Sequence, residues 1–410
     1  MNKTLGSEIE YLFSPQAIRE QCRKIFELSL RNKTHFTIDL EQIEPTAHYV
    51  QQIIQQNYPD LNIPYHSRWN HFKAGSIDRL KILNNALEEL SFEEQTKAKI
   101  ELVITSVLLD AGAGHQWKYV EKNQKNVFSR SEGLAIASFA LFMDGFFSHN
   151  KNMPMRVDSQ RLQKITLAEL EGALQVKPNN QLEGLEGRLK LLQNLGKIIE
   201  KKDTYFESFS ENRLGNLCCY FLRNADNKKI SAVKILRALQ DSLGDIWPGR
   251  VTLNETNMGD TWLYQPLGTG TEQYVPFHKL SQWLTYSLIE PLEDYGLSIT
   301  DLNNLTGLAE YRNGGLMIDK GIITLKDKSL FNETHTPKDD IIVEWRALTI
   351  SLLDLLGEAI TKLLNTDLNA MPLVNILEGG TWHAGRKAAL EKRPETGSPP
   401  FKIKSDGTVF

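Results

Sequence analysis

Apolar residues recur at three- and four-residue spacing along most of this chain, a pattern typical of amphipathic helices. It predicts helices over residues 15–30, 43–56, 76–86, 92–109, 131–142, 162–173, 185–200, 229–239, 277–290 and 341–364. Strand signals are sparse. The best is GLMIDKGIITLKD, where Lys320 and Gly321 separate two short apolar runs in the manner of a hairpin turn. The pattern therefore predicts a mainly α fold with a small β-hairpin element.

The length of 410 residues suits one large domain or two lobes. We predict a single large helical domain over residues 1–390, in which two lobes could meet near residues 240–270. Residues 391–410 are rich in Pro, Gly and Ser. They are predicted to form an extended C-terminal tail that either wraps the body or frays.

Four side chains that can bind a ligand share one face of the predicted helix over residues 277–290. A helix turns about 100° per residue, so the four fall within a sector of roughly 60°. They are Lys279, Trp283, Tyr286 and Glu290. Pro291 is expected to end the helix, because proline biases the residue before it away from the α conformation. A structural role explains this face equally well, with Lys279 and Glu290 as a solvated ion pair and Trp283 as a cap on the core.

The segment LTGLAEYRNGGL follows and favours a site. It places a carboxylate, a phenol, a guanidinium and an amide in a row, at Glu310, Tyr311, Arg312 and Asn313. Gly314 and Gly315 come next and permit backbone conformations that bulky residues cannot adopt.

Charge and composition narrow the class of protein. The formal net charge is −4, so no basic surplus is available to grip a phosphate backbone, and nucleic acid is not expected as a partner. The three cysteines, of which Cys218 and Cys219 are adjacent, suit neither a disulfide framework nor a C-x-x-C zinc site. No signal-peptide core or apolar membrane span is evident. We expect a cytoplasmic protein without a cofactor or a membrane partner.

A glycine-rich turn follows the predicted helix over residues 92–109. Asp110 precedes Gly112 and Gly114 there, but the phosphate-loop pattern G-x-x-x-x-G-K-[ST] is absent. Trp117 and Tyr119 follow and could supply flat surfaces for a ring. Core packing explains both aromatic residues at least as well.

Arg130 stands in the segment SRSEGLA, at the start of another predicted helix. Ser129 or Ser131 can cap that helix, which leaves Arg130 to be explained. An arginine beside the free N–H groups of a helix start is a natural site for a phosphate.

Two further segments have competing interpretations. His66 and His71 are five residues apart, which is not a recognised spacing for metal ligands, so no metal site is predicted. The segment LEGGTWHAGR either closes a pocket or begins a helix capped by Thr381.

The candidate segments share one combination of side chains: a carboxylate, an aromatic ring and an arginine or lysine. No G-x-S-x-G elbow or H-E-x-x-H helix is present, and the neighbouring cysteines carry no reactive signature, so nucleophilic serine or cysteine chemistry is disfavoured. Carboxylates suit glycosidic bond cleavage, because one can stabilise a sugar with oxocarbenium character while another assists the leaving group.

Several strings together resemble a known family. They are YHSRWNHF, LLDAGAGHQWKY, RSEGLAIAS, DGFFS, PFHKLSQWLTYSLIEPL, LTGLAEYRNGGL and EGGTWHAGR. They are similar to the uracil-catabolism protein four family of the ring-opening pathway of yeasts and bacteria. The resemblance spans roughly residues 10–390 and implies a step at or near the release of urea.

This resemblance implies hydrolysis of the C–N glycosidic bond in ribosylurea or its 5-phosphate. A weaker likeness, carried by LTGLAEYRNGG, links the chain to queuosine nucleotide N-glycosidases and implies a DNA-glycosylase-like core. That likeness places Glu310 where an acid faces the sugar. The comparison expects Asp more often than Glu there, and the longer side chain reaches about one methylene further.

These expectations combine into a mechanism with a small-molecule substrate and no metal. Glu310 stabilises the cation or activates water, so Glu310→Gln should lower turnover by about a hundredfold or more. Asp110 or Glu290 is a second acid/base or accepts a ribose hydroxyl. The predicted substrate-binding residues have three roles. Aromatic rings at Trp117, Tyr119, Trp283 and Tyr286 line the pocket, and Lys279, Arg312 and Arg130 bind phosphate. His278 and Gln282 bind urea, and the amide of Asn313 also contacts the substrate.

Two other functions fit the same sequence. One is an amidohydrolase that attacks the urea carbonyl, which needs a metal or a nucleophile. The other is a non-catalytic carrier or regulatory partner of the ring-opening pathway. The sequence leaves the oligomeric state open.

Overall fold

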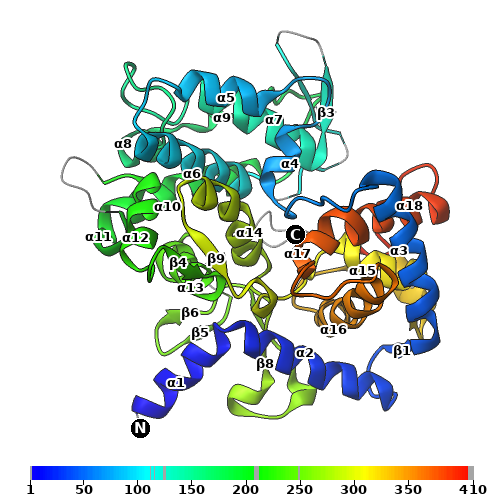
Figure 1. Ribbon diagram of the computed structural model, residues 1–410. Coiled ribbons are helices and arrows are strands. Elements are labelled where there is room, and N and C mark those ends of the chain that lie inside the picture. Colours follow the sequence, from blue (N-terminus) through cyan, green and yellow to red (C-terminus); the bar gives the residue numbers. More distant parts are fainter. Residues whose placement is uncertain are drawn as a thin grey trace. The chain divides into compact units, whose positions relative to one another are not determined.

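The computed structural model describes residues 2–110, 112–114, 116–122, 126–206, 212–247 and 250–404. Helices dominate this part of the chain, and its named strands are two or three residues long and pair in two-stranded sheets (Figure 1). The prediction of a mainly α fold with small β elements is confirmed. None of the described helices is long and apolar enough to cross a membrane.

The chain groups into two compact units. Unit 1 holds the described residues of 1–66, 249–283 and 301–405, and unit 2 holds those of 67–248 and 284–300. Helix α14 contributes its first turn to unit 1 and the rest to unit 2. The predicted single domain over residues 1–390 stays a prediction.

Unit 1 is built mainly from helices that are distant in sequence. Its helices are α1 (Asn2–Leu12), α2 (Pro15–Leu30), η1 (Leu40–Gln42), α3 (Ile43–Asn57), η4 (Gln265–Leu267), η5 (Gly270–Gln273), η6 (Leu302–Asn304), α15 (Tyr311–Asp319), η7 (Lys328–Asn332), α16 (Asp340–Leu363), α17 (Leu373–Ile376), η8 (Leu377–Thr381) and α18 (Trp382–Lys392). Its strands are β1 (Phe36–Ile38), β5 (Thr252–Leu253), β6 (Thr256–Asn257), β7 (Thr261–Leu263), β8 (Tyr274–Pro276), β10 (Ile323–Leu325), β11 (Thr334–His335) and β12 (Lys402–Ile403).

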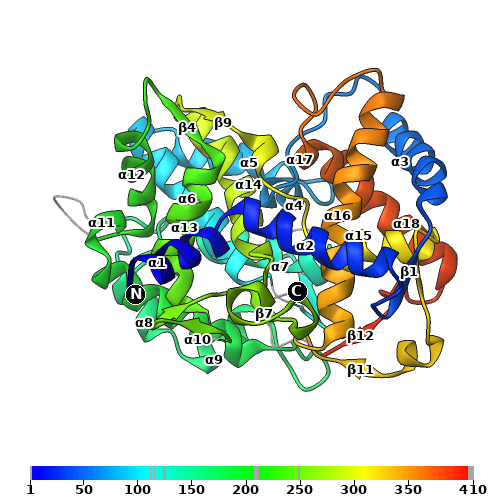
Figure 2. The ribbon, with the colours of Figure 1, turned by 90° about the horizontal axis from the view of Figure 1, so that it is seen from below.

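The long helix α16 is the centre of unit 1. It packs against α2, α3 and α15, and α15 packs in turn against α18 (Figure 2). Most of α16 from Ile341 to Thr361 is buried. Such a helix, apolar over most of its surface, is stable only when neighbours cover it on several sides.

Helix α6 is the centre of unit 2, as α16 is of unit 1. Its helices are α4 (Arg68–Phe72), α5 (Arg79–Leu87), α6 (Phe92–Leu108), α7 (Arg130–Met143), α8 (Ser159–Lys164), α9 (Leu167–Ala173), α10 (Leu185–Lys201), α11 (Asp203–Phe206), η2 (Leu214–Asn216), α12 (Leu217–Arg223), α13 (Ala232–Leu243), η3 (Gly244–Ile246) and most of α14 (Lys279–Asp294). Its strands are β2 (Lys118–Val120), β3 (Val127–Ser129), β4 (Lys229–Ser231) and β9 (Ser298–Thr300). Helix α6 packs against α4, α7, α10 and α12.

Side-chain caps explain where several helices begin. Ser14 caps α2 by accepting a hydrogen bond from the Ala17 N–H, and Pro15 occupies the first turn, where its missing N–H costs nothing. A capping box at Thr166 and Glu169 starts α9 and divides the helix predicted over residues 162–173. Ser231 caps α13 by accepting a hydrogen bond from the Val233 N–H, and residues 229–231 form β4 instead of a helix.

The prediction that Pro291 ends its helix is wrong. Helix α14 continues to Asp294 with Pro291 inside it. Proline has no N–H for the carbonyl four residues earlier, that of Ser287. The indole Nε1 of Trp69 donates to that carbonyl oxygen at 2.9 Å. A side chain from α4 thus replaces the missing helical bond, and the main cost of the proline falls.

The hairpin predicted around Lys320 and Gly321 is also wrong. The run before this turn is helix α15, and only the run after it is a strand, β10. Strand β10 pairs antiparallel with β1, far away in sequence. Gly321 has a φ of 78° and so supplies the left-handed turn that ends the helix. Antiparallel pairs of neighbouring strands occur instead at β2–β3, β5–β6 and β7–β8.

The C-terminal segment after α18 lies along unit 1. Phe401 is buried against the rings of Phe331, His335 and Trp345. Strand β12 pairs in parallel with β11. Residues 405–410 of the predicted tail lie outside the described residues.

Candidate functional site

The polar centre of unit 2 is the buried guanidinium of Arg68, at the start of α4. Its Nε donates to the Ser106 hydroxyl at 2.7 Å, and its Nη1 lies 3.0 Å from a carboxylate oxygen of Asp110. Burial lowers the pKa of Arg68, and the charge of Asp110 opposes that shift. A buried arginine of this kind needs its carboxylate partner to remain charged.

Asp110 is held at the end of α6. Its Oδ2 accepts a hydrogen bond from the Ser131 hydroxyl at 2.7 Å, in addition to the ion pair with Arg68. Ser131 therefore contacts Asp110, while Ser129 occupies the cap position of α7 without a side-chain cap bond. The predicted capping role of these two serines is not observed.

A second buried arginine fixes the glycine-rich turn after α6. Arg188 donates to the carbonyl oxygens of Leu109 at 2.8 Å and Gly112 at 3.0 Å. Gly114 has a φ of 75°, and an added Cβ would lie 2.6 Å from the Glu183 carboxylate. Arg188 and Glu183 thus contact the described residues Leu109, Gly112 and Gly114, which flank Asp110 in the sequence.

Glu290 lies near the end of α14, and its carboxyl group is largely buried. Its Oε2 accepts a hydrogen bond from the Ser67 hydroxyl at 2.7 Å. Burial raises the pKa of Glu290, and the Ser67 hydrogen bond offsets only part of that shift. Ser67 and Arg68 are consecutive, so one dipeptide contacts both predicted carboxyl groups of unit 2, Glu290 and Asp110.

The four predicted aromatic walls are all buried side chains. Trp117, Tyr119, Trp283 and Tyr286 are each at most 5% exposed. The Trp117 indole donates to the Leu174 carbonyl oxygen at 2.9 Å, and burial raises the pKa of Tyr119 to about 12. Core packing accounts for these contacts, and a role in ligand binding stays a prediction.

Arg130 is half-buried at the first position of α7, with a φ of 55°. A non-glycine residue with a positive φ is uncommon and is often found where surrounding structure holds it in place. Its neighbour Ser131 contacts Asp110. The predicted phosphate ligand Arg130 is thus the sequence neighbour of a residue that binds the predicted acid Asp110.

Glu310 in unit 1 is the N-cap of α15. Its two carboxylate oxygens accept hydrogen bonds from the N–H groups of Arg312 at 2.9 Å and Asn313 at 2.7 Å. The side chain is buried. This arrangement satisfies helix-start donors and places a negative charge at the positive end of the helix. Glu310 therefore has a structural task, whatever else it does.

The adjacent glycines serve close packing and not an unusual turn. Both lie within α15, and a Cβ at Gly314 would lie 2.7 Å from the Trp345 ring of α16. The Trp345 indole donates to the Gly314 carbonyl oxygen at 3.0 Å. The expectation of a special backbone conformation at Gly314 and Gly315 is corrected: neither has a positive φ.

Arg312 and Asn313 are bonded within unit 1. Arg312 Nη1 donates to the Gly397 carbonyl oxygen at 3.2 Å in the C-terminal segment. Asn313 donates to the Leu308 carbonyl oxygen at 3.2 Å and accepts from the Thr381 hydroxyl at 2.9 Å. Thr381 thus reaches α15 and makes no side-chain cap bond for α18.

The predicted urea ligands are also bonded within the fold. Gln282 donates to the Thr306 hydroxyl at 2.8 Å and accepts from the Thr306 N–H at 2.9 Å. His278 Nε2 lies 2.9 Å from the Leu12 carbonyl oxygen, which can only accept, so this nitrogen carries the proton. Lys279 lies with its ammonium 5.7 Å from the centre of the Trp283 ring. Binding of urea or phosphate here stays a prediction.

Sequence reasoning missed a buried bidentate ion pair of unit 1. Arg346 of α16 binds Asp260 through two parallel hydrogen bonds of 2.8 and 2.7 Å. Burial alone would raise the pKa of Asp260, but the charge and hydrogen bonds of Arg346 and the Trp262 indole hold it at about 2. No local motif links residues 86 positions apart, so only a relative-position signal such as covariation could have found the pair.

A second missed pair joins His66 to Glu378. His66 Nδ1 lies 2.8 Å from Glu378 Oε2, and both side chains are buried. Glu378 belongs to η8, a π-helical stretch, and the glycines after it let α3 approach: a Cβ at Gly380 would lie 2.6 Å from Val50. The interpretation of LEGGTWHAGR as a glycine turn before a helix capped by Thr381 is therefore wrong, because the glycines are helical packing positions. That the segment closes a pocket stays a prediction.

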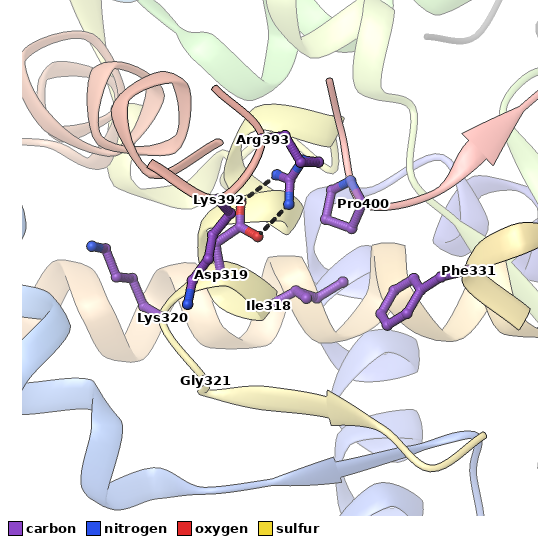
Figure 3. A pocket seen from close by; sticks show the side chains of 8 residues that line it. All are labelled: Ile318, Asp319, Lys320, Gly321, Phe331, Lys392, Arg393 and Pro400. Atoms are coloured by element: carbon purple, nitrogen blue, oxygen red, sulfur yellow. Dashed lines mark hydrogen bonds and ion pairs between the residues drawn. The ribbon is translucent and has the colours of Figure 1, made fainter. Parts of the chain in front are cut away.

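A pocket of about 480 Å³ lies in unit 1 where α15 and α18 end (Figure 3). It is lined by Ile318, Asp319, Lys320, Gly321, Phe331, Lys392, Arg393 and Pro400. Arg393 forms a bidentate ion pair with Asp319 at 2.8 and 2.6 Å. None of the predicted site residues lines this pocket. Among the described residues, no group of three or more His, Cys, Asp and Glu side chains is arranged to hold a metal ion.

Comparison with known proteins identifies the family. The family model described as "Protein of unknown function (DUF1688)" matches residues 11–410, so the chain belongs to this family. It is 37% identical over 443 residues to "Uracil catabolism protein 4" of Lachancea kluyveri, covering 99% of this chain and 100% of the relative. It is 36% identical over 408 residues to "Protein urg3" of Schizosaccharomyces pombe, covering 97% and 98%. The resemblance inferred from the motifs is confirmed.

Proposed function

We propose that this protein acts in uracil catabolism as a hydrolase that cleaves the C–N glycosidic bond of ribosylurea or its 5-phosphate. The pathway is supported by the full-length similarity to a protein named for uracil catabolism. The reaction is supported by the chemistry of the carboxyl groups in unit 2.

The observation that carries the proposal is the pair of carboxyl groups held by one dipeptide. Ser67 holds Glu290, whose pKa is raised, and Arg68 holds Asp110 in an ion pair. Glycoside hydrolysis uses two carboxyl groups with different environments, and a carboxyl group with a raised pKa together with a carboxylate bound to a cation supplies such a pair.

In the proposed reaction Glu290 is the general acid. The bond between the anomeric carbon and the urea nitrogen breaks, its electron pair goes to the nitrogen, and Glu290 supplies the proton. Water adds to the anomeric carbon and gives a proton to Asp110. The net reaction is ribosylurea plus water to ribose plus urea. Arg130, next to Ser131, would bind the 5-phosphate.

Glu310, Lys279, Arg312, His278, Gln282 and Asn313 form the competing assignment. They lie in unit 1 and include the acid that the sequence ranks first. We place the chemistry in unit 2 because both oxygens of Glu310 already accept helix-start N–H groups, whereas Glu290 accepts one hydroxyl.

The test uses the purified full-length chain with ribosylurea and, separately, ribosylurea 5-phosphate. We expect urea and reducing sugar to appear in equal amounts, and the faster substrate identifies the phosphorylation state. Ammonia and carbon dioxide in place of urea would establish attack at the carbonyl carbon. Binding of both compounds without any product would make the protein a carrier and refute the proposal.

A further inference from the structure

Helix α12 of unit 2 carries two neighbouring thiols that the proposed reaction does not use. The sulfur atoms of Cys218 and Cys219 are 3.7 Å apart. Cys218 is buried, whereas Cys219 is half-exposed and so within reach of a small reagent. A reagent that enters at Cys219 would therefore find a second thiol next to it.

The start of α6 supplies the charges around Cys219. The Cys219 thiol lies 3.5 Å from Glu93 Oε1, and the Lys97 ammonium lies 2.6 Å from the same oxygen. Lys97 also binds Glu94 at 3.1 Å. The Lys97 ammonium therefore offsets part of the repulsion that the Glu93 carboxylate exerts on a thiolate at this position.

The two thiols have unequal acidity. The hydrogen bond from the Cys218 thiol lowers the pKa of Cys219, and the charge of Lys97 adds to this effect; together they outweigh burial and the charge and hydrogen bond of Glu93, which raise it. The same hydrogen bond, with burial, raises the pKa of Cys218. One sulfur thus tends to be the thiolate, which is the reactive form, while its neighbour keeps a proton.

We propose that Cys219 is a site of reversible oxidation by peroxide and that Cys218 is its resolving thiol. The Cys219 thiolate attacks one oxygen of hydrogen peroxide, the O–O bond breaks, and hydroxide leaves, so that Cys219 becomes a sulfenic acid. The Cys218 sulfur then attacks the Cys219 sulfur and water leaves. Peroxide is reduced by two electrons and the thiol pair is oxidised to a disulfide.

The product would disturb α12. Adjacent residues have Cα atoms about 3.8 Å apart, below the spacing of roughly 4.4 to 6.8 Å that disulfides prefer. Such a bond is strained and easily reduced, which suits a reversible modification. Because α12 packs against α6, closing the bond should loosen that contact. This inference is independent of the proposed function.

The test treats the reduced full-length protein with hydrogen peroxide and maps its peptides by mass spectrometry. We expect the peptide with Cys218 and Cys219 to become lighter by two hydrogen atoms, and dithiothreitol to restore it. In Cys218→Ser, Cys219 should stop as a sulfenic acid that dimedone traps. In Cys219→Ser, the peptide should remain unchanged at the same dose.

Cys22 provides an internal control, because it is fully buried and burial raises its pKa. Iodoacetamide at neutral pH should label Cys219 at least about tenfold faster than Cys22, since one pKa unit changes the thiolate fraction tenfold. This labelling uses the wild-type chain and does not depend on folding of a variant. Equal labelling of both thiols, or oxidation of Cys22 before Cys219, would overturn the proposal.

Discussion

Two glutamates, Glu310 buried in unit 1 and Glu290 half-buried in unit 2, have the same side chain and opposite surroundings. Glu310 accepts hydrogen bonds from two main-chain N–H groups at a helix start. Glu290 accepts one hydroxyl, and burial raises its pKa. The difference shows that one glutamate can cap a helix while another makes few hydrogen bonds within the fold. Residue type alone does not distinguish the two.

The polar contacts around each glutamate also differ between the two units. In unit 1 the Asp260–Arg346 pair, the Gln282–Thr306 bonds and the Asn313–Thr381 bond satisfy polar groups within the fold. In unit 2, Ser67 and Arg68 contact Glu290 and Asp110 from one short segment. The following predictions challenge this contrast.

The largest expected effect is on turnover. Glu290→Gln should lower kcat for urea release by about a hundredfold or more, the usual contribution of a general acid. Glu293→Gln, an exposed neighbour on α14, is the control and should retain activity. The competing prediction is a loss of the same size in Glu310→Gln. If only Glu310→Gln loses turnover, the reaction belongs to unit 1 and the contrast drawn here is reversed.

A large effect on stability is expected at the ion pair of unit 1. Asp260→Asn leaves the Arg346 guanidinium buried without a counter-charge, so the free energy of unfolding in urea should fall by about 3 kcal/mol or more. Asp354→Asn is the control, because the Arg19–Asp354 pair is about one-third exposed on each side. That variant should lose less than about 1 kcal/mol. Equal losses would show that burial does not set the value of these pairs.

The same pair predicts how acid acts on unit 1. The pKa of Asp260 is about 2 in the folded protein, below its ordinary value of 3.8. Its stabilising contribution is therefore complete above pH 4 and is lost as the pH falls towards 2. Urea unfolding at pH 3 and pH 6 should show a smaller difference for Asp260→Asn than for the wild type.

A smaller loss of stability is expected at the helix cap. Glu310→Gln keeps an acceptor but removes the charge at the start of α15, so the free energy of unfolding should fall by about 1 kcal/mol. Glu333→Gln, at an exposed position, is the control. No change in Glu310→Gln would mean that the cap bonds contribute nothing measurable, and the structural interpretation of this residue would be wrong.

The smallest expected effect is the pH dependence of Glu290. Its folded pKa is raised, so the folded protein binds this proton more tightly than the unfolded chain, and stability declines as the pH rises from about 4.5 through the folded pKa. Glu290→Gln should remove this decline when the free energy of unfolding in urea is measured between about pH 4.5 and pH 8. Parallel pH profiles for variant and wild type would place Glu290 in an ordinary solvated environment.

Periodicity predicted several helices closely because their apolar faces are continuous in sequence. The helix predicted over residues 15–30 has the bounds of α2, where Ser14 and Pro15 give a local start signal. Pro291 misled the prediction because the bond that compensates for it comes from Trp69, which is distant in sequence. Local rules describe a helix end only when no tertiary partner intervenes.

The sequence identified candidate residues by their type, but it did not show what each residue does in the folded protein. Glu290, Asp110 and Glu310 stand out in the sequence as acids near glycines, cations or aromatic rings, but nothing there shows that two main-chain N–H groups occupy Glu310. Arg68, Arg188, Asp260 and Arg346 were missed as organising groups. Each acts through partners far away in the chain, and a buried charge has no signature in sequence apart from those partners.

The sequence by itself determined the helical class of this protein and its family, because both are carried by local patterns: apolar spacing and contiguous motifs. Only the tertiary structure decided which carboxyl groups are satisfied by the fold and which is desolvated with a raised pKa. The physical reason is that the state of a carboxyl group depends on burial and on the charges and N–H groups within a few ångströms of it, and folding alone brings those groups together.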